Sequence, residues 1–528
     1  MTDWERINMK NFYCYYEYIK ADGAQLFTVI CAPNKVGKFP VTIYRTPYCD
    51  YEKDVSDEQS VENWLKDHQG WLKAGYVSIY QNCRGTGKST GNCIPYVNER
   101  KDGLLLLDWI RKQPFYNGEI YLSGGSYCCT VNYSCAPFAD DIKGAVFQIQ
   151  DCNFHRLNFL NGFLHTGGRY NWYVDMYKKN LNIKKSFSSD LLKTFPLKDV
   201  MNKALGEEAE AFNSKLMHPD INDEYWQTHP YARTYSTDVP KTTKFPVLFM
   251  TGMYDFYVGG MISMWEELSE EVRSKSAFII HPYAHRIAGK DTFYDFPDSD
   301  VNEVFPDVVG KWFAYVRGLS KAPVETGKIT YYNMFGDGWR TDDFKAETPI
   351  TFTLGNGERS YDYDPLSPAS FKGGLSHNFG GTDWQDKPNQ RDDIITVYTD
   401  KFMEDTFIKG KMKAKLKVKS NCDDTCFYMR ISLCKAEGDW GLRDDITKIS
   451  NFTDHYKKNS EITVDFTFDP IAFTVKKGEK LRIDISSSCF PNFSLHTNQK
   501  AHYALADNPV IAHNTVILSD SELTVFTE

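Results

Sequence analysis

Before residue 320, short and nearly continuous apolar runs alternate with segments that have helical spacing. The runs are strand-length, and several end in Gly, Asp or His, whereas residues 102–114 predict a helix that stops at Pro114. This alternation is typical of a mostly parallel sheet with helices on both faces, in which ligands bind beyond the carboxyl ends of the strands. The expected strands are 40–48, 76–83, 119–125, 145–151, 246–255 and 276–285.

The pattern changes twice along the chain. After the run ending at residue 151 come aromatic and polar helical patches without a clear strand, which predict an inserted helical domain. From about residue 325, strand-length runs separated by turns predict an all-β sandwich or jelly roll, beginning with "ITYYNMF". The expected domains are therefore a core of residues 1–151 and 241–322, a helical cap of 152–240 and a β-sandwich of 323–528.

Composition narrows the function classes. The formal net charge is −9, and the sequence lacks the basic stripe that a nucleic-acid partner requires. Because no apolar run is long enough to span a bilayer and the first residues do not resemble a secretory signal, no membrane partner and a cytoplasmic location are expected. Cys422 and Cys426 invite a metal hypothesis, but no further ligands follow at zinc-site spacing. We therefore expect no metal and no organic cofactor.

A nucleotide site is one alternative, because "CRGTGKSTG" contains Gly87-Lys88-Ser89-Thr90, the last part of a P-loop. A P-loop also requires a glycine where this chain has Asn82, and Pro95 follows where the phosphate-facing helix should run. The sequence therefore favours a glycine-rich turn after a strand, with Lys88 in solvent.

A nucleophile is the stronger hypothesis. Ser126 follows a predicted strand in "YLSGGSYCC" and precedes a segment that can begin a helix, as in the G-x-S-x-G elbow, although Cys128 replaces the last glycine. Asp255 and His285 come at later strand ends, in the order that an α/β-hydrolase uses for its acid and base. His281 competes with His285 for the role of base, with a packing or capping role as its alternative.

Further motifs in the same order resemble the cocaine esterase / X-Pro dipeptidyl-peptidase family of serine hydrolases over nearly the whole chain. They are "YRTPY", "QNCRGTGKSTG", "DGLLLLDWIRKQPFYNGEIYLSGGSY", "GMYDFYVGG", "HPYAH", "YDYDPLSP" and "LRIDISSSCFPNF". The resemblance implies an α/β-hydrolase core with an inserted helical cap and a C-terminal jelly roll. This chain departs from the family where Cys128 and Cys129 follow the nucleophile, and small packing residues are the expected role of both.

The resemblance also implies roles for individual residues. Ser126 is the nucleophile, Asp255 the acid and His285 the base. Tyr48 donates its phenol to an oxyanion hole beside the backbone amide of Tyr127. Two donors aimed at the same point are physically reasonable, because negative charge develops there on a tetrahedral intermediate.

The sequence says less about the residues of the substrate pocket than about the catalytic residues. Where α-amino acid ester hydrolases of this family carry acidic residues for a substrate ammonium group, this chain has Tyr257 and Val258, which weighs against an α-amino acyl group. An aromatic acyl pocket is expected instead, with packing inside the cap as the alternative for its cap residues. Its candidates are Tyr257, Phe163 and Trp172, with Phe159 and Tyr173 also considered, and Asp151 or Asp175 could still face a cationic group.

The sequence thus predicts a serine hydrolase that cleaves an ester or amide of a small molecule with a bulky, largely apolar acyl group. The acyl group would be carried on Ser126 as an acyl-enzyme. An X-Pro dipeptidyl-peptidase-like peptidase, an acylase or acyltransferase, and a non-catalytic protein that binds a partner or carbohydrate remain as alternatives. Assembly into a homo-oligomer is left open.

Overall fold

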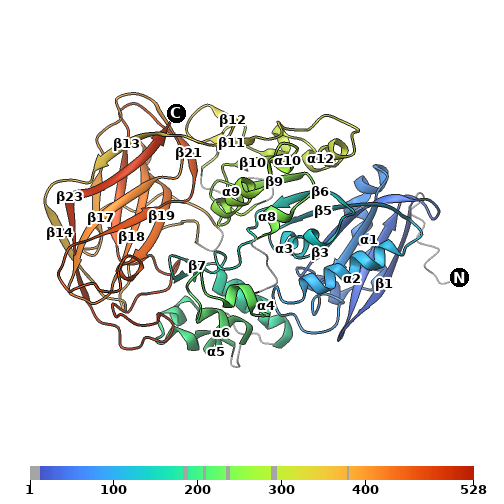
Figure 1. Ribbon diagram of the computed structural model, residues 1–528, viewed down its shortest axis with the longest axis horizontal. Coiled ribbons are helices and arrows are strands. Elements are labelled where there is room, and N and C mark those ends of the chain that lie inside the picture. Colours follow the sequence, from blue (N-terminus) through green and yellow to red (C-terminus); the bar gives the residue numbers. More distant parts are fainter. Residues whose placement is uncertain (1–11, 182–187, 206–209, 233–237, 287–293, 377–379) are drawn as a thin grey trace.

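A computed structural model describes residues 12–181, 188–205, 210–232, 238–286, 294–376 and 380–528 of the chain. Figure 1 shows three regions: an α/β core, a smaller helical region beside it, and a β domain that carries the C-terminus. No helix among these residues combines the length and the apolar character needed to cross a bilayer.

One ten-stranded sheet organises the core, in the order β1-β2-β4-β3-β5-β6-β9-β10-β11-β12. In this spatial order, each pair of adjacent strands from β4 through β3, β5, β6, β9 and β10 to β11 is parallel. Every residue of β4, β9 and β10 is buried. Burial on both faces explains why these strands are continuous apolar runs. The strands are β1 (Tyr13–Ala21), β2 (Ala24–Ala32), β3 (Phe39–Thr46), β4 (Val77–Asn82), β5 (Tyr116–Gly125), β6 (Ile142–Gln148), β9 (Val247–Gly252), β10 (Ala277–His281), β11 (Ile329–Asn333) and β12 (Gly338–Asp342).

Successive residues of β10 show how the sheet is covered, because Phe278 and Ile280 belong to one apolar cluster and Ile279 to another. On the second face, Trp312 is buried and its indole N–H donates to the carbonyl of Ala145 at 3.1 Å. The predicted helix at 102–114 is confirmed with shifted ends. The core helices are α1 (Asp57–Lys73), α2 (Glu99–Arg111), α3 (Tyr127–Tyr133), α9 (Val258–Glu267), α10 (Glu270–Arg273), α11 (Val301–Val304) and α12 (Val308–Val316).

The segment expected as a cap contains short helices and one small hairpin that the sequence pattern did not predict. Residues near the hairpin join the C-terminal domain through backbone hydrogen bonds, including Thr166 N–H to Asn492 O at 2.9 Å and Ser494 N–H to Leu164 O at 2.9 Å. The elements are β7 (Phe159–Leu160), β8 (Phe163–Leu164), α4 (Arg169–Leu181), α5 (Val200–Leu205), α6 (Glu210–Leu216), α7 (Tyr225–Thr228) and α8 (Val239–Thr242).

The C-terminal domain contains a seven-stranded and a four-stranded sheet, whose strands pair antiparallel. This confirms an all-β domain, while jelly-roll connectivity stays a prediction. Its strands are β13 (Thr348–Thr353), β14 (Glu358–Tyr363), β15 (Ile395–Tyr398), β16 (Thr406–Gly410), β17 (Lys413–Ser420), β18 (Cys426–Cys434), β19 (Asp439–Lys448), β20 (Ile462–Thr467), β21 (Ile471–Val475), β22 (Lys480–Ser486) and β23 (Ala512–Thr527).

The structure differs from the expected limit of the core at residue 322. The run "ITYYNMF" does not open the β domain, because its buried strand β11 pairs in parallel with β10 and antiparallel with β12. A strand buried along its whole length is most stable with a neighbour on each side, and the core sheet supplies both.

Lys88 also differs from its expected place in solvent. Its ammonium lies 3.0 Å from a carboxylate oxygen of Asp57, and only 11% of its side chain is exposed. Nearby, the hydroxyl of Ser89 accepts from the backbone N–H of Phe27 at 2.9 Å. The glycine-rich stretch therefore ties β4 to its neighbour β2.

Candidate active site

Ser126 stands on a strained turn between β5 and α3. Its φ is +55° and its ψ is −129°, a conformation that residues other than glycine rarely adopt. A Cβ at Gly124 would lie 2.3 Å from the carbonyl oxygen of Cys128, so strand and helix approach too closely for a larger residue. Cys128, in the position of the usual last glycine, is buried without disrupting this turn.

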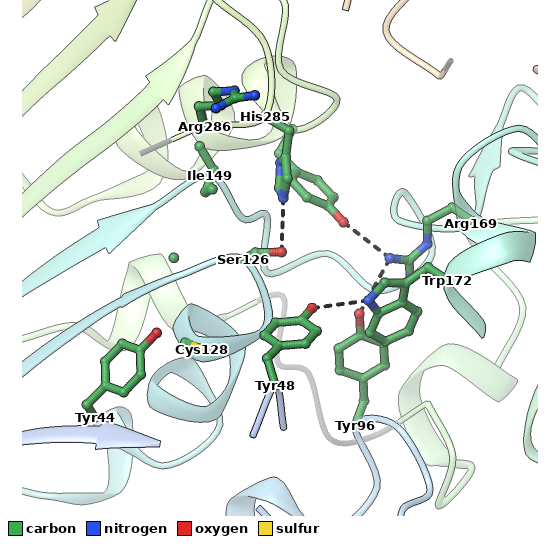
Figure 2. A pocket seen from close by; sticks show the side chains of 12 residues that line it. Tyr44, Tyr48, Tyr96, Ser126, Cys128, Ile149, Arg169, Trp172, His285 and Arg286 are labelled. Carbon is green, nitrogen blue, oxygen red and sulfur yellow. Dashed lines mark hydrogen bonds between the residues drawn. The ribbon is translucent and has the colours of Figure 1, made fainter. Parts of the chain in front are cut away.

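The structure brings Ser126, His285 and Asp255 into one hydrogen-bonded chain. The Nε2 atom of His285 lies 3.0 Å from Ser126 Oγ, and its Nδ1 lies 3.1 Å from Asp255 Oδ1. Figure 2 shows the first of these contacts, with the imidazole directed at the serine. In this geometry the imidazole can accept the serine proton through one nitrogen while it donates to the carboxylate through the other.

The carboxylate of Asp255 is completely buried and fixed by two further donors. The hydroxyl of Thr251 donates to its Oδ2, and the backbone N–H of Tyr257 donates to its Oδ1, each at 3.0 Å. These contacts hold the acid in one orientation behind His285.

The loops that carry the acid and the base are joined by their backbones. The N–H of Met253 donates to His281 O at 2.6 Å, and that of Tyr254 donates to Tyr283 O at 3.0 Å. A Cβ at Gly252 would lie 2.0 Å from Tyr283 O, so only glycine permits this approach. His281 is buried with its Nε2 3.0 Å from the carbonyl of Arg286. The structure therefore places His281 within the loop and His285 against Ser126.

Tyr48 and Tyr127 offer two donors on the other side of Ser126. The Tyr48 hydroxyl accepts from the indole N–H of Trp172 at 3.1 Å, as Figure 2 shows. Although 44% of Tyr48 is exposed, desolvation of its hydroxyl raises the pKa of Tyr48, which keeps the hydroxyl protonated and able to donate. The backbone N–H of Tyr127 begins α3, where N–H groups have no partner within the helix. The Tyr127 side chain has a separate role, because its hydroxyl donates to buried Glu99 at 2.7 Å.

These groups surround a cavity of about 630 Å³. Its walls are mainly aromatic, and the ring of Tyr257 lies edge-on to the His285 ring with 5.5 Å between centroids. Among the described residues that line it, none is a carboxylate. They are Tyr44, Tyr48, Tyr96, Gly125, Ser126, Cys128, Ile149, Arg169, Trp172, Tyr257, His285 and Arg286.

Of the expected pocket residues, Trp172 and Tyr257 line this cavity and Phe163 does not. Phe163 is 3% exposed, and its ring lies 6.1 Å from that of His496 in the C-terminal domain. The expectation for Phe163 is corrected because the β7–β8 hairpin faces the β domain. Phe159 is likewise buried in the cap, 5.9 Å from the ring of Tyr503.

Neither acidic candidate lines the cavity. Asp151 is buried with one carboxylate oxygen 2.6 Å from Arg156 Nε, so its charge is already paired. Asp175 is exposed on α4. A cationic group in the cavity would therefore meet no carboxylate from either of them.

Sequence reasoning missed Arg169, the first residue of α4. This side chain is 2% exposed, and its hydrogen-bond acceptors among the described residues are phenols: Tyr257 at 3.2 Å, with Tyr96 and Tyr173 each at 3.4 Å. The available signal was a single arginine inside the aromatic stretch "GGRYNWY". Tyr44 was also missed as a pocket residue, although it begins the motif "YRTPY". Tyr96, Ile149 and Arg286 were missed as well, and none of them lies in a quoted motif.

The thiols next to Ser126 are packing residues in this structure. Burial raises the pKa of both Cys128 and Cys129, so neither is a ready thiolate. Within the described part of the chain, no three His, Cys, Asp or Glu residues are grouped so that they could hold a metal ion.

Comparisons with known proteins agree with this architecture. Residues 22–286 match the X-Pro dipeptidyl-peptidase (S15 family), and residues 324–522 match the X-Pro dipeptidyl-peptidase C-terminal non-catalytic domain. The cocaine esterase of Rhodococcus sp. (strain MB1 Bresler) is 23% identical, covering 90% of this chain and 91% of its own.

Two solved structures share the fold along almost their whole length. An aminopeptidase from a marine sediment Thaumarchaeota archaeon has a TM-score of 0.80 and 18% identity, covering 99% of this chain and 97% of its own. An α-amino acid ester hydrolase has a TM-score of 0.79 and 17% identity, covering 98% and 97%.

Proposed function

The chain belongs to the X-Pro dipeptidyl-peptidase (S15) family of serine hydrolases, and from that premise we propose that it forms an acyl-enzyme on Ser126. Its substrate would be a small ester or amide with a bulky, largely apolar acyl group. The observation that carries the proposal is the unbroken hydrogen-bonded chain from Ser126 through His285 to Asp255, beside an aromatic cavity.

In the first half-reaction, Ser126 Oγ attacks the substrate carbonyl carbon as His285 Nε2 takes the hydroxyl proton. The carbonyl oxygen becomes an oxyanion, which accepts hydrogen bonds from the Tyr48 hydroxyl and the Tyr127 N–H. Each such donor typically lowers a barrier by a few kcal/mol. The imidazolium then gives its proton to the leaving alcohol or amine as the tetrahedral intermediate collapses to the acyl-enzyme.

In the second half-reaction, a water molecule replaces the leaving group. His285 takes a proton from the water as its oxygen attacks the ester carbon, and returns that proton to Ser126 Oγ as the acid product forms. Throughout, Asp255 stabilises the imidazolium and fixes which nitrogen faces the serine. Acyl transfer to an amine would use the same intermediate, with the amine in place of water.

The lining of the cavity favours an esterase over a peptidase that recognises a free N-terminus. An N-terminal ammonium group in a water-poor cavity needs an anionic partner, and the described lining contains Arg169 and Arg286 but no carboxylate. The strained φ of Ser126 disfavours a purely structural or binding role, because such strain is retained mainly at functional sites.

A fluorophosphonate probe tests this proposal directly. The folded wild-type protein should gain the mass of one probe at Ser126, and Ser126→Ala should gain none. Absence of labelling in folded wild-type protein would contradict the nucleophile. A panel of p-nitrophenyl esters and Xaa-Pro-anilides then separates the two substrate classes, and preferential cleavage of the anilides would favour the peptidase.

A further inference from the structure

Two cations are buried next to the candidate pocket without a carboxylate partner among the described residues. Arg169 is 2% exposed and Lys215 is 1% exposed. Among the described residues the Lys215 ammonium has no hydrogen-bond partner, and it lies 4.9 Å from the ring centre of Phe154 and 5.4 Å from that of Tyr173. Aromatic faces attract a cation, but they do not cancel its charge.

Arg169 differs from the other buried arginines in the described part of the chain, of which Arg443 donates to backbone carbonyls and others pair with carboxylates. Arg45 lies 3.4 Å from a carboxylate oxygen of Glu99, and Arg430 lies 2.9 Å from one of Asp444. A buried ion costs several kcal/mol of effective desolvation, which such pairing offsets. Arg169 has phenols in place of a carboxylate.

Those phenols do not supply a negative charge. Burial raises the pKa of Tyr96, Tyr173 and Tyr257, so all three hydroxyls remain neutral at physiological pH. The guanidinium therefore keeps its full positive charge, and its Nε–H has no acceptor among the described residues. Repulsion from Arg169 adds to burial in lowering the pKa of Lys215 to about 7.

The charge of Arg169 is directed into the cavity. Figure 2 shows its guanidinium on the wall formed with Trp172 and Tyr96, pointing toward the space beside Ser126. Tyr257 connects this cation to the reacting groups, because its ring lies against His285 and its hydroxyl accepts from Arg169. An anionic group near Arg169 would thus lie in the same cavity as the scissile carbonyl.

We propose that the substrate's acyl group ends in a carboxylate, which Arg169 binds as the specificity-determining residue. The preferred substrate would be a monoester or monoamide of a dicarboxylic acid. This inference rests on the proposed function and names the substrate class of the same site. A carboxylate fits because its two oxygens match adjacent N–H groups of a planar guanidinium.

The exposure of two lining residues indicates that the substrate's carboxylate belongs to its acyl group and not to its leaving group. Arg169 is buried, whereas Arg286 on the same cavity is exposed. The leaving group must depart, and water must enter, before the acyl-enzyme can be hydrolysed. Both exchanges are easiest through the exposed side, which leaves the buried side for the acyl group that stays on Ser126.

The first experiment uses wild-type protein and matched substrates. The p-nitrophenyl monoesters of succinic, glutaric and adipic acids are compared with the same esters whose free carboxylate is masked as a methyl ester. For at least one chain length, kcat/KM should be about 30-fold or more higher for the free acid, as expected for a desolvated charge pair. Equal rates for all three pairs would overturn the inference.

Ser126→Ala separates failure of the inference from failure of the proposed function. If Ser126→Ala abolishes hydrolysis of every ester but wild type shows no preference for the free acids, only the carboxylate inference falls. If Ser126→Ala retains hydrolysis of both kinds of ester, the proposed function itself is contradicted.

Variants then assign the preference to one side chain. Arg169→Gln should lower the ratio of kcat/KM for the free acid to kcat/KM for the masked ester by about 30-fold or more. Arg169→Lys should recover part of the loss, because it restores the charge without the planar fork. Lys101→Gln is the matched control, since it removes one positive charge from a side chain that is 61% exposed. An equal loss for both substrates in Arg169→Gln would contradict a role in selection.

Competitive inhibition tests the same inference with wild-type protein alone, so the result does not depend on whether a variant folds. The free dianions of the same three acids should inhibit hydrolysis of the masked ester competitively in wild-type protein, and the corresponding diamides should not. Equal inhibition by acid and diamide would overturn the inference.

Discussion

The two walls of the candidate cavity differ in the hydrogen-bond partners of their buried charged side chains. On the sheet side, Asp255 is completely buried but accepts from His285, Thr251 and a backbone N–H. On the cap side, Arg169 is also buried, but its hydrogen-bond acceptors among the described residues are neutral phenols. The chain thus supplies partners for the acid of the triad, whereas our proposal leaves the counter-charge of Arg169 to the substrate.

The origin of each wall explains the difference. The sheet side is assembled from loops at the carboxyl ends of β5, β9 and β10, and backbone hydrogen bonds join the loops after β9 and β10. The cap side begins with α4, whose first residue is Arg169. On the proposed function, reaction geometry would depend on the sheet, whereas selectivity would depend on one cap side chain.

The largest effect is expected on the sheet side, from Ser126→Ala. Removing the nucleophile of a triad costs about 10⁴ to 10⁶ in kcat, because the whole covalent route is lost. The fold should survive, since alanine at φ +55° is about as strained as serine. Steady-state hydrolysis of a p-nitrophenyl ester measures the loss, and thermal unfolding checks the fold. A variant that folds and keeps near-wild-type kcat would contradict the assignment.

Tyr48→Phe tests the donor that lies between the two walls. Loss of one oxyanion donor should lower kcat by about 10² to 10³ with little change in KM, because the hydrogen bond matters most in the transition state. The measurement is a full kinetic analysis with a single neutral ester.

Trp172→Phe is the companion variant for Tyr48. It removes the indole N–H that orients the Tyr48 hydroxyl but leaves that hydroxyl in place. A smaller loss of about tenfold is expected. If the two variants were equal, or if Tyr48→Phe changed only KM, Tyr48 would be a binding residue and not an oxyanion donor.

The sheet side could be predicted from the sequence because its signals are local. Each expected strand is one apolar run, and the carboxyl ends of parallel strands meet at one edge of a sheet. Ser126, Asp255 and His285 could thus be selected from strand ends and chain order, before any contact was known. The resemblance to a hydrolase family added Tyr48, which strand ends and chain order do not select.

The cap side could not be predicted, because its contacts are distant in sequence. Phe163 looked like a pocket aromatic, but the hairpin that carries it bonds to residues near Ser494. Arg169 lies in no recognised motif. Its proposed role in substrate binding depends on the lack of a nearby carboxylate among the described residues, and hydrophobic periodicity does not show which side chains meet in the fold. The same reason explains the limit at 322, since only pairing with β10 assigns β11 to the core.

A smaller effect, on stability, is expected from Lys215→Met. The folded-state pKa of Lys215 is about 7, below the value of about 10.4 in an unfolded chain. Between these values the unfolded state holds one more proton, so the free energy of unfolding rises with pH by up to about 1.4 kcal/mol per unit from this group. Below pH 7 both states are protonated and the penalty is complete.

Methionine fills a similar volume and does not titrate. Lys215→Met should therefore stabilise the protein most at pH 7 and below, and its advantage should shrink as pH rises toward 10. Urea unfolding of both proteins at pH 6, 8 and 9.5 measures the difference. Arg169 and His229 influence the same region, so the comparison is made between variant and wild type at each pH. A constant difference would contradict a buried, titrating Lys215.

The smallest effect on activity is expected from Phe163→Leu, which tests where the cap side of the pocket ends. Phe163 packs against the β domain and does not line the cavity. The substitution should cost about 1 kcal/mol of unfolding free energy through lost packing, and leave the preference between free and masked esters unchanged. Trp172→Leu should alter kcat/KM for both esters, because Trp172 lines the cavity and contacts Tyr48. A changed preference in Phe163→Leu at unchanged stability would extend the selective wall to the hairpin, and selectivity could then no longer be assigned to the α4 side chains alone.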